Sequence, residues 1–496
     1  MVTVISILNN LTMRKLTKLA PQPMFNYFED ICQIPRPSEK EDKIRKFLLE
    51  FARKNKLQAK SDKAGNVLIS KPAVPGRENA PVVILQTHMD MVCEKNSDKV
   101  FDFDKDAIVP VISGEWIKAD GTTLGADCGI GIAAQLALLA STEISHGPVE
   151  CLMTVAEETG LTGAFNLQRG FMSGSLLINL DSEDEGEIFI GCAGGLGTVA
   201  KLKYKRSDVP ENYTAIKLSI TGLSGGHSGD DINKNRGNAN KILNRLLWNI
   251  SQEYDLRLSL FEGGNLSNAI PREANAIFGV PSSEKESVIK ALDQLIKNIK
   301  NEYIFNEPDL KINIQKNRIP EKVIDQKTQK NLLNALYACP HGILEMSTRM
   351  EGMVETSSNL ASVKFTGDDN IVITTSQRSE IESRKYYAAE MVRSVFELAG
   401  AETSHSDSYP GWTPNPGSGL LKIAVGSYKK LFDTEPVVRS IHAGLECGLF
   451  LEKYPDLDMI SIGPTIKGAH SPDERLNIET VGKFWNHLKE ILENIS

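Results

Sequence analysis

Apolar and polar positions alternate in ways that predict strands and helices in turn along the first 200 residues. Residues 42–54 are apolar at every third or fourth position, which predicts an amphipathic helix. Short apolar runs at 82–85, 149–155 and 176–180 predict buried strands, and the longer run at 129–139 predicts a buried helix. This alternation predicts an α/β domain whose central sheet is mostly parallel and flanked by helices.

The pattern changes near residue 200. Residues 199–205 and 216–221 alternate between polar and apolar side chains, as expected for a sheet with one exposed face. Helices are predicted at 239–254 and 285–303. These features predict an α+β domain inserted into the first one.

The α/β pattern resumes near residue 387. A strand is predicted at 459–462, and an amphipathic helix at 478–495 closes the chain. The sequence therefore predicts a discontinuous α/β domain, made of residues 1–207 and 387–496, with an insertion at 208–386.

The composition of the 496-residue chain limits the classes of protein to which it can belong. Hydrophobic residues make up 41% and charged residues 24%, which is typical of a folded globular protein. The net charge of −8 argues against a nucleic-acid partner, because phosphate backbones require a basic surface. No run of about 18 apolar residues occurs, so we expect no membrane-spanning helix and no membrane partner.

The cysteines and the first residues bear on localisation. Seven cysteines, without any C-x-x-C pair, argue against a disulfide framework or a thiolate zinc site and favour a reducing cytoplasm. The apolar stretch Val2–Leu8 is followed, not preceded, by basic residues. We therefore interpret it as an N-terminal extension and not as a secretory signal.

Acidic side chains and one histidine stand where the predicted strands end. These residues are His88, Asp90, Glu157, Glu158 and Asp181. Asp127 lies where a glycine-rich loop enters the apolar helix. Because ligands of α/β sheets bind at the carboxyl ends of strands, we expect these residues to converge. Such acids repel one another unless protons or cations intervene, and histidine with carboxylates suits zinc, cobalt or manganese.

Each of these acids, taken alone, is equally compatible with a helix cap or a solvated turn. Their coincidence at several strand ends favours a shared site. In the adjacent pair Glu157 and Glu158, one carboxylate can bind a metal while the other takes a proton from water. That division of roles is typical of a hydrolase. A metal-binding protein without catalytic activity is the alternative, and Glu157 beside a ligand argues against it.

Two short motifs are rejected. Gly222–Gly226 matches the G-x-S-x-G nucleophile elbow, but a polar loop follows where a helix is required. Gly195–Ala200 matches G-x-G-x-x-A, but it leads into an alternating strand and not into a helix. Cys192 and Cys447 have no evident helper for a nucleophilic role, and the role of His442 stays open.

Six motifs together resemble the M20 metallopeptidases. They are His88–Val92, Leu124–Asp127, Ala156–Gly160, Asp181–Glu183, Gly225–Gly229 and Gly468–Pro472. Further segments resemble the aminoacyl-histidine dipeptidase subgroup, namely Ser267–Glu273, Pro410–Trp412 and His442–Gly448. The resemblance runs from about residue 19 to the C-terminus.

The resemblance implies a site for two divalent metal ions, with zinc expected first and cobalt or manganese as alternatives. The implied ligands are Asp127 as a bridge, His88 and Asp181 on one ion, and Glu158 and His470 on the other. Glu157 would be the general base and acid, and Asp90 would orient His88. The family also implies a cis peptide after Asp127, where this chain has Cys128 and many relatives have Asp or Asn.

The resemblance makes the inserted domain a lid that binds substrate. His227 would stabilise the oxyanion. Asn268, Arg378 and Gly444 would contact the substrate, Arg378 through its terminal carboxylate.

The activity implied is metal-dependent hydrolysis of Xaa-His-like dipeptides, with short peptides as the partner. The alternative is an amidohydrolase of the same family that acts on N-acyl amino acids or tripeptides. The size of the insertion, about 180 residues, favours a homodimer.

Overall fold

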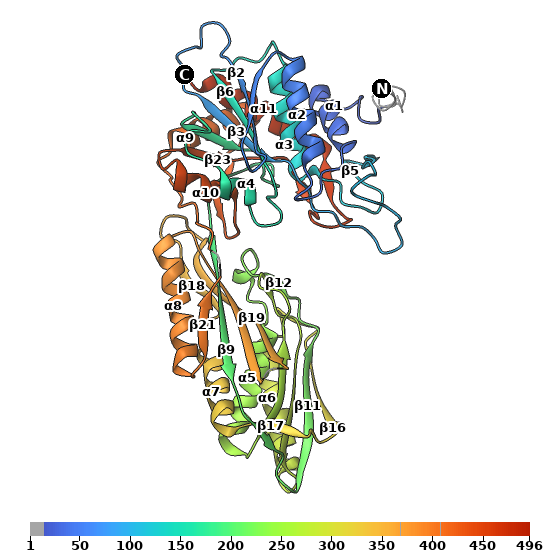
Figure 1. Cartoon of the computed structure of the whole chain (residues 1–496), viewed down its shortest axis with the longest axis vertical. Helices are drawn as coiled ribbons and strands as arrows, with labels where there is room; N and C mark the ends of the chain where they lie inside the picture. Colours follow the sequence, from blue (N-terminus) through green and yellow to red (C-terminus); the bar gives the residue numbers. More distant parts are fainter. Residues whose placement is uncertain (1–13, 368, 407) are drawn as a thin grey trace. The chain divides into compact units, whose positions relative to one another are not determined.

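The computed structural model describes residues 14–367, 369–406 and 408–496, which form two compact units (Figure 1). The first unit contains the described residues up to Gly191, together with Asn415–Arg439 and Leu449–Ser496. The second contains Cys192–Pro414 and Ser440–Gly448. The stretch Val2–Leu8, interpreted above as an extension, lies outside the described residues.

The first unit is an α/β structure. Its helices are α1 (Gln22–Cys32), α2 (Asp42–Lys54), α3 (Ala126–Ala140), α4 (Thr162–Asn166), α9 (Gly419–Phe432), α10 (Glu446–Lys453) and α11 (Ile478–Asn494). The strands of its large sheet are β1 (Gln58–Ser61), β2 (Val67–Lys71), β3 (Val83–His88), β6 (Val149–Thr154), β7 (Leu176–Asn179), β8 (Glu187–Cys192), β22 (Val437–Ile441) and β23 (Asp458–Ser461). A small sheet holds β4 (Val111–Ser113), β5 (Trp116–Lys118), β24 (Ile466–Lys467) and β25 (Arg475–Asn477). The elements β8, β22 and α10 cross the boundary between the units.

The large sheet has the strand order β1-β2-β6-β3-β7-β23-β8-β22. Its central strands β6, β3, β7 and β23 are parallel. The strands β1, β2 and β8 pair antiparallel with their neighbours. Every residue of β3 is buried, as expected for a central parallel strand covered on both faces. The predicted parallel sheet is confirmed for the centre, while its margins are antiparallel.

Helices flank this sheet in the way that the sequence predicts. Helix α1 packs against α3, α3 packs against β3, and α9 packs against α11 and β23. Almost all of α3 is buried, in agreement with the apolar run that predicted it. Helix α11 buries one stripe that includes Val481, Phe484 and Leu488.

The second unit is an α+β structure. Its strands are β9 (Gly194–Lys203), β10 (Arg206–Asp208), β11 (Tyr213–Thr221), β12 (Gly226–His227), β13 (Arg257–Gly263), β14 (Ala269–Ile270), β15 (Ala274–Pro281), β16 (Lys311–Asn317), β17 (Lys322–Ile324), β18 (Gly342–Met346), β19 (Val354–Thr366), β20 (Asn370–Ser379) and β21 (Glu402–His405). Its helices are η1 (Ile232–Lys234), α5 (Ala239–Glu253), α6 (Lys285–Glu302), α7 (Gln326–Ala338) and α8 (Glu382–Leu398). The main antiparallel sheet has the order β16-β11-β15-β13-β19-β20-β9-β21, with β18 paired to β19. Helices α5 and α8 pack on this sheet over a core that includes Leu246, Phe261 and Phe396.

The compact units and the segments expected from the sequence have different bounds. The expected insertion covers residues 208–386, whereas the second unit begins at Cys192 and continues to Pro414. The reason is that β9 pairs with β20 and β21, and α8 packs on β9. Strand β9 precedes the expected insertion and α8 extends beyond its end, but the partners of both lie in the second unit.

No helix in the described ranges is long and apolar enough to cross a membrane. The cysteines that the sequence contains are free thiols, and all but Cys93 are buried.

Candidate functional site

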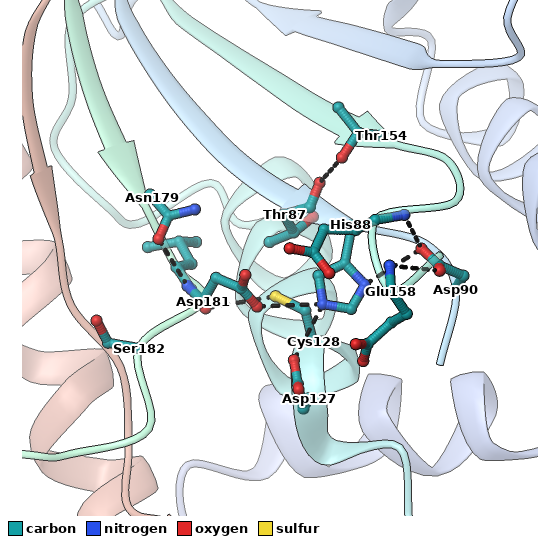
Figure 2. A network of polar contacts seen from close by, with 12 residues as sticks. Thr87, His88, Asp90, Asp127, Cys128, Thr154, Glu158, Asn179, Asp181 and Ser182 are labelled. Carbon is teal, nitrogen blue, oxygen red and sulfur yellow. Dashed lines mark hydrogen bonds and ion pairs between the residues drawn. The ribbon is translucent and has the colours of Figure 1, made fainter. Parts of the chain in front are cut away.

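The strand-end residues converge at one edge of the parallel sheet. His88 ends β3, the pair Glu157–Glu158 follows β6, and Asp181 follows β7. Because β6, β3 and β7 are parallel neighbours, their carboxyl ends meet at this edge (Figure 2). We call the group formed by His88, Asp90, Asp127, Glu157, Glu158, Asp181 and His470 the acidic centre.

Asp127 lies between the two histidines of the acidic centre. Its Oδ1 is 3.0 Å from His88 Nε2, and its Oδ2 is 3.2 Å from His470 Nε2. His88 Nε2 is also 3.2 Å from Asp181 Oδ1, and His470 Nε2 is 3.1 Å from Glu158 Oε2. The structure therefore brings together two ligand sets that share Asp127.

Protons on the two histidines offset part of the negative charge of the acidic centre. Hydrogen bonds to Asp127 and Glu158 raise the pKa of His470 to about 11. Burial raises the pKa of Asp127, but its bonds to His470 and His88 outweigh this and hold the pKa well below the usual range. Burial raises the pKa of Asp181 to about 6 against the opposing charge of His88. Divalent cations would replace these protons as the balancing positive charge.

The residues present fit such cations. The ligand atoms of Asp127, Glu158 and His470 lie within 4.8 Å of one another, and those of His88, Glu157 and Glu158 do so as well. Glu158 Oε1 is buried and accepts no hydrogen bond from the described residues. A buried carboxylate oxygen without a donor is costly, and a metal ion removes that cost.

Asp90 holds two parts of the acidic centre at once. Its Oδ1 lies 3.3 Å from His88 Nδ1, on the ring side opposite to Asp127. It also accepts hydrogen bonds from the backbone N–H of Glu157 at 3.0 Å and of Glu158 at 3.2 Å (Figure 2). Burial raises the pKa of Asp90, but the hydrogen bond and charge of His88 prevail and lower it to about 2. Asp90 therefore orients both the imidazole and the turn that carries the glutamates.

The peptide bond between Asp127 and Cys128 is cis, as the family resemblance implies. Cys128 is buried, and its thiol donates a hydrogen bond of 3.5 Å to the carbonyl of Leu180. The thiol thus bonds to the backbone beside Asp181.

Sequence reasoning missed Glu474, a buried carboxylate that holds the loop before Asp127. It accepts backbone hydrogen bonds from Leu124 at 2.6 Å, Gly125 at 2.9 Å and Ala126 at 2.7 Å. Unpaired N–H groups at the start of a helix favour such an anion. Glu474 lies two residues after the Gly468–Pro472 motif, which is the only signal in the sequence that could have indicated it.

Arg36 is the second residue that the sequence did not indicate. Its buried guanidinium donates to the carbonyl of Met89 at 3.0 Å and also to the carbonyls of Asp90 and Gly125. At Gly125, where φ is +69°, a Cβ atom would lie 2.6 Å from this guanidinium. The arginine therefore connects the loops that carry Asp90 and Asp127.

A separate group of hydrogen-bond donors lies in the second unit. It consists of His227, Ser228, Arg378 and Tyr409, and we call it the donor cluster. Arg378 Nη1 donates to Tyr409 Oη at 2.8 Å, and its Nε donates to Ser228 Oγ at 3.4 Å. Only 6% of Arg378 is exposed, yet no carboxylate in the described ranges pairs with it. A buried guanidinium without a counter-ion favours an anionic ligand.

His227 presents a second donor to the same place. Its Nδ1 accepts hydrogen bonds from the backbone N–H of Gly229 at 3.3 Å and of Asp230 at 3.2 Å. In a neutral ring, Nε2 then carries the proton. Nε2 lies 3.3 Å from Arg378 Nη2, and because a guanidinium can only donate, the two N–H groups do not bond to each other when the proton is on Nε2. An oxygen of a bound carbonyl or carboxylate can accept from both.

The other expected substrate residues differ in their relation to the donor cluster. Gly444 lies against Tyr409, and a Cβ atom there would be 2.8 Å from the tyrosine ring. The backbone carbonyl of Asn268 accepts from Ser228 N–H at 2.8 Å, whereas its side chain is exposed. His442, whose role the sequence left open, is buried, and its Nε2 is 2.8 Å from Ser357 Oγ. Burial and the charge of Arg378 lower its pKa to about 3, so this ring is neutral.

Residues 84–494 match the profile of Peptidase family M20/M25/M40. The chain belongs to this family. The resemblance deduced from the six motifs is thereby confirmed, and so is the α/β fold class.

Individual M20 relatives match over almost the whole chain. The cytosol non-specific dipeptidase of Escherichia coli K12 is 45% identical over 484 residues, which are 97% of this chain and 99% of the relative. The crystal structure of aminoacylhistidine dipeptidase from Vibrio alginolyticus is 43% identical, with a TM-score of 0.90 over 97% of this chain and 98% of that one. A tripeptidase from Staphylococcus aureus covers 96% of this chain and 99% of its own, with a TM-score of 0.56 and 17% identity, and shares the fold.

Proposed function

We propose that this protein is a metal-dependent dipeptidase with broad specificity that includes Xaa-His dipeptides. The observation that carries the proposal is the pair of ligand sets that share Asp127, with Glu157 beside them. The relative that is 45% identical over nearly the full length is a dipeptidase by name, which supports the substrate class.

The acidic centre would hold two divalent cations. Asp127 would bridge them, His88 and Asp181 would bind one, and Glu158 and His470 the other. Imidazole and carboxylate ligands without thiolates favour Zn²⁺, with Co²⁺ and Mn²⁺ as alternatives. When bound, such cations activate water and polarise the peptide carbonyl.

Glu157 is the proton carrier in this proposal. It takes the proton of the attacking water and delivers it to the amine that leaves. Asp90 keeps Glu157 in place through the backbone hydrogen bond at 3.0 Å, and it keeps His88 in the orientation that exposes Nε2. These contacts support a fixed general base and not a mobile surface acid.

The donor cluster is proposed to recognise the substrate. His227 Nε2–H stabilises the negative charge that develops on the carbonyl oxygen. Arg378 binds the terminal carboxylate, which favours peptides with a free C-terminus close to the scissile bond. Asn268 and Gly444 are proposed to contact the substrate beside these groups.

The remaining proposals concern assembly and localisation. We propose a homodimer, on the basis of the size of the inserted segment, and sedimentation at micromolar concentration would test it. A cytoplasmic location is supported by the free cysteines and by the name of the Escherichia coli relative.

The decisive experiment is a substrate panel with and without chelator. Purified protein supplied with Zn²⁺, Co²⁺ or Mn²⁺ should hydrolyse Xaa-His and other dipeptides faster than tripeptides or N-acetyl amino acids. Exhaustive chelation should abolish hydrolysis, and returning the metal should restore it. Full activity after chelation would contradict the metal mechanism, and faster turnover of N-acetyl amino acids or tripeptides would favour the alternative amidohydrolase.

A further inference from the structure

The hydroxyl of Tyr409 accepts a hydrogen bond of 2.8 Å from Nη1 of Arg378. We propose that Tyr409 is a positioning residue that fixes Arg378 for the terminal carboxylate of the substrate. This inference rests on the proposed function, and it assigns a role to a residue that the sequence motifs did not indicate.

Strand pairing brings the two residues together. Arg378 of β20 pairs with Gly195 of β9, and Gly195 forms a β-bridge with Tyr409 on its other side. The tyrosine is therefore two strands away from the arginine, with only a glycine between them. A Cβ atom on Gly195 would lie 2.4 Å from Tyr409 Cζ, so the phenol ring extends across Gly195 toward Arg378. Any larger residue at 195 would displace the ring.

Tyr409 is held firmly in this position. Its backbone N–H and carbonyl exchange hydrogen bonds of 3.1 Å with Gly195. Its carbonyl also accepts a hydrogen bond of 2.7 Å from Lys385, a fully buried lysine of α8. On the other side the ring lies against Gly444, where a Cβ atom would approach to 2.8 Å. Two glycines and a buried lysine thus determine where the hydroxyl lies.

The hydrogen bond to Tyr409 would fix the guanidinium of Arg378 before an anion binds. A guanidinium on a flexible side chain loses conformational entropy on binding unless it is held in advance. Because Tyr409 Oη accepts from Arg378 Nη1, it holds the guanidinium in place before any anion binds. The side chains that contact Arg378 in the described residues are Ser228, Tyr409 and His227, none of them a carboxylate, so the terminal carboxylate of the substrate would supply the negative charge that this cation lacks.

The test compares Tyr409→Phe with the wild type on a dipeptide and on its C-terminal amide. Removing the hydroxyl should raise KM for the dipeptide about tenfold, the effect of one hydrogen bond to a charged group, and change kcat less than about twofold. The amide lacks the carboxylate, so its kcat/KM should stay the same within about twofold. Tyr213→Phe is the matched control, because it removes a hydroxyl bonded to Asp255 elsewhere in the second unit.

A double-mutant cycle separates positioning from a general structural effect. In an Arg378→Lys background, Tyr409→Phe should cause no further rise in KM, because the two residues act as one unit. Additive increases in KM in the double variant would overturn the role of Tyr409. So would equal decreases in kcat/KM on the dipeptide and on its amide, accompanied by a lowered melting temperature. Wild-type protein that hydrolyses no dipeptide would overturn the proposed function first, and that result is read independently of the variants.

Discussion

The acidic centre of the first unit and the donor cluster of the second are chemical opposites. In the acidic centre, carboxylates outnumber the two histidines, and no residue that the structure describes donates a hydrogen bond to Glu158 Oε1. In the donor cluster, Arg378 has neutral partners and no carboxylate among the described residues. In the proposed function, cations complete the first group and an anion completes the second. The comparison teaches that each cluster, taken by itself, indicates the charge of what it binds.

The two clusters should also control different kinetic constants. In the proposed function, residues of the acidic centre act on the chemical step or on metal binding, so their loss should appear in kcat or in metal content. In the donor cluster, His227 would act on the chemical step and Arg378 on substrate recognition, so the loss of Arg378 should appear mainly in KM. The following predictions test this division.

The largest effect is expected for Glu157→Gln. The amide cannot accept a proton, so kcat should fall by about 10²–10⁴-fold, while the protein keeps both metals. Steady-state kinetics with elemental analysis would measure this, and Glu143→Gln at an exposed position is the control. Full turnover with the metals retained would exclude Glu157 as the general base.

A smaller effect, on KM, is expected for Arg378→Ala. Loss of the guanidinium should raise KM for dipeptides by about 30- to 100-fold, because a charge-assisted contact to the carboxylate disappears. The kcat should change little. Arg393→Ala, on the exposed surface of α8, is the control. A fall in kcat without a rise in KM would break the division between the clusters.

Glu474→Gln should weaken metal binding by about 10- to 100-fold, the usual cost of losing a group that orients a ligand. The amide cannot accept all the backbone hydrogen bonds that place the loop before Asp127. Titration with a metal-sensitive dye would measure the affinity, and Glu479→Gln, at an exposed site, is the control. An unchanged affinity would show that this loop holds Asp127 without Glu474.

The smallest effect concerns stability and lies outside both clusters. Burial lowers the pKa of His487 in α11 to about 4, and its Nε2–H donates to the carbonyl of Ala424 at 2.8 Å. The unfolded chain binds this proton near pH 6.5, so the stabilisation is present above that pH and is lost as the pH falls toward 4. Between pH 7 and 5 the free energy of unfolding should fall about 2 kcal/mol more in the wild type than in His487→Gln. Urea unfolding at pH 7 and pH 5 would measure this. An equal fall in the free energy of unfolding for both proteins would contradict the prediction.

The sequence predicted that the residues of the acidic centre lie together, because a general rule links the position of a residue at a strand end to its place in the folded sheet. Parallel strands end at one edge, so His88, Glu157 and Asp181 could be expected together before any coordinates. Glu474 and Arg36 were not predicted, because a single sequence does not distinguish a buried charged residue that bonds to the backbone from a charged residue at the surface. Their partners are backbone carbonyl and N–H groups, which almost every residue carries.

The sequence by itself determined the alternation of strands and helices, the side chains proposed as metal ligands and the family. Periodicity and the order of motifs are local properties of the chain, so they can be read without coordinates. Only the tertiary structure decided that β9 and α8 belong with the second unit, and that Tyr409 reaches Arg378 across Gly195. Antiparallel pairing between distant segments has no local signal, because its register depends on packing that forms only when the whole sheet assembles.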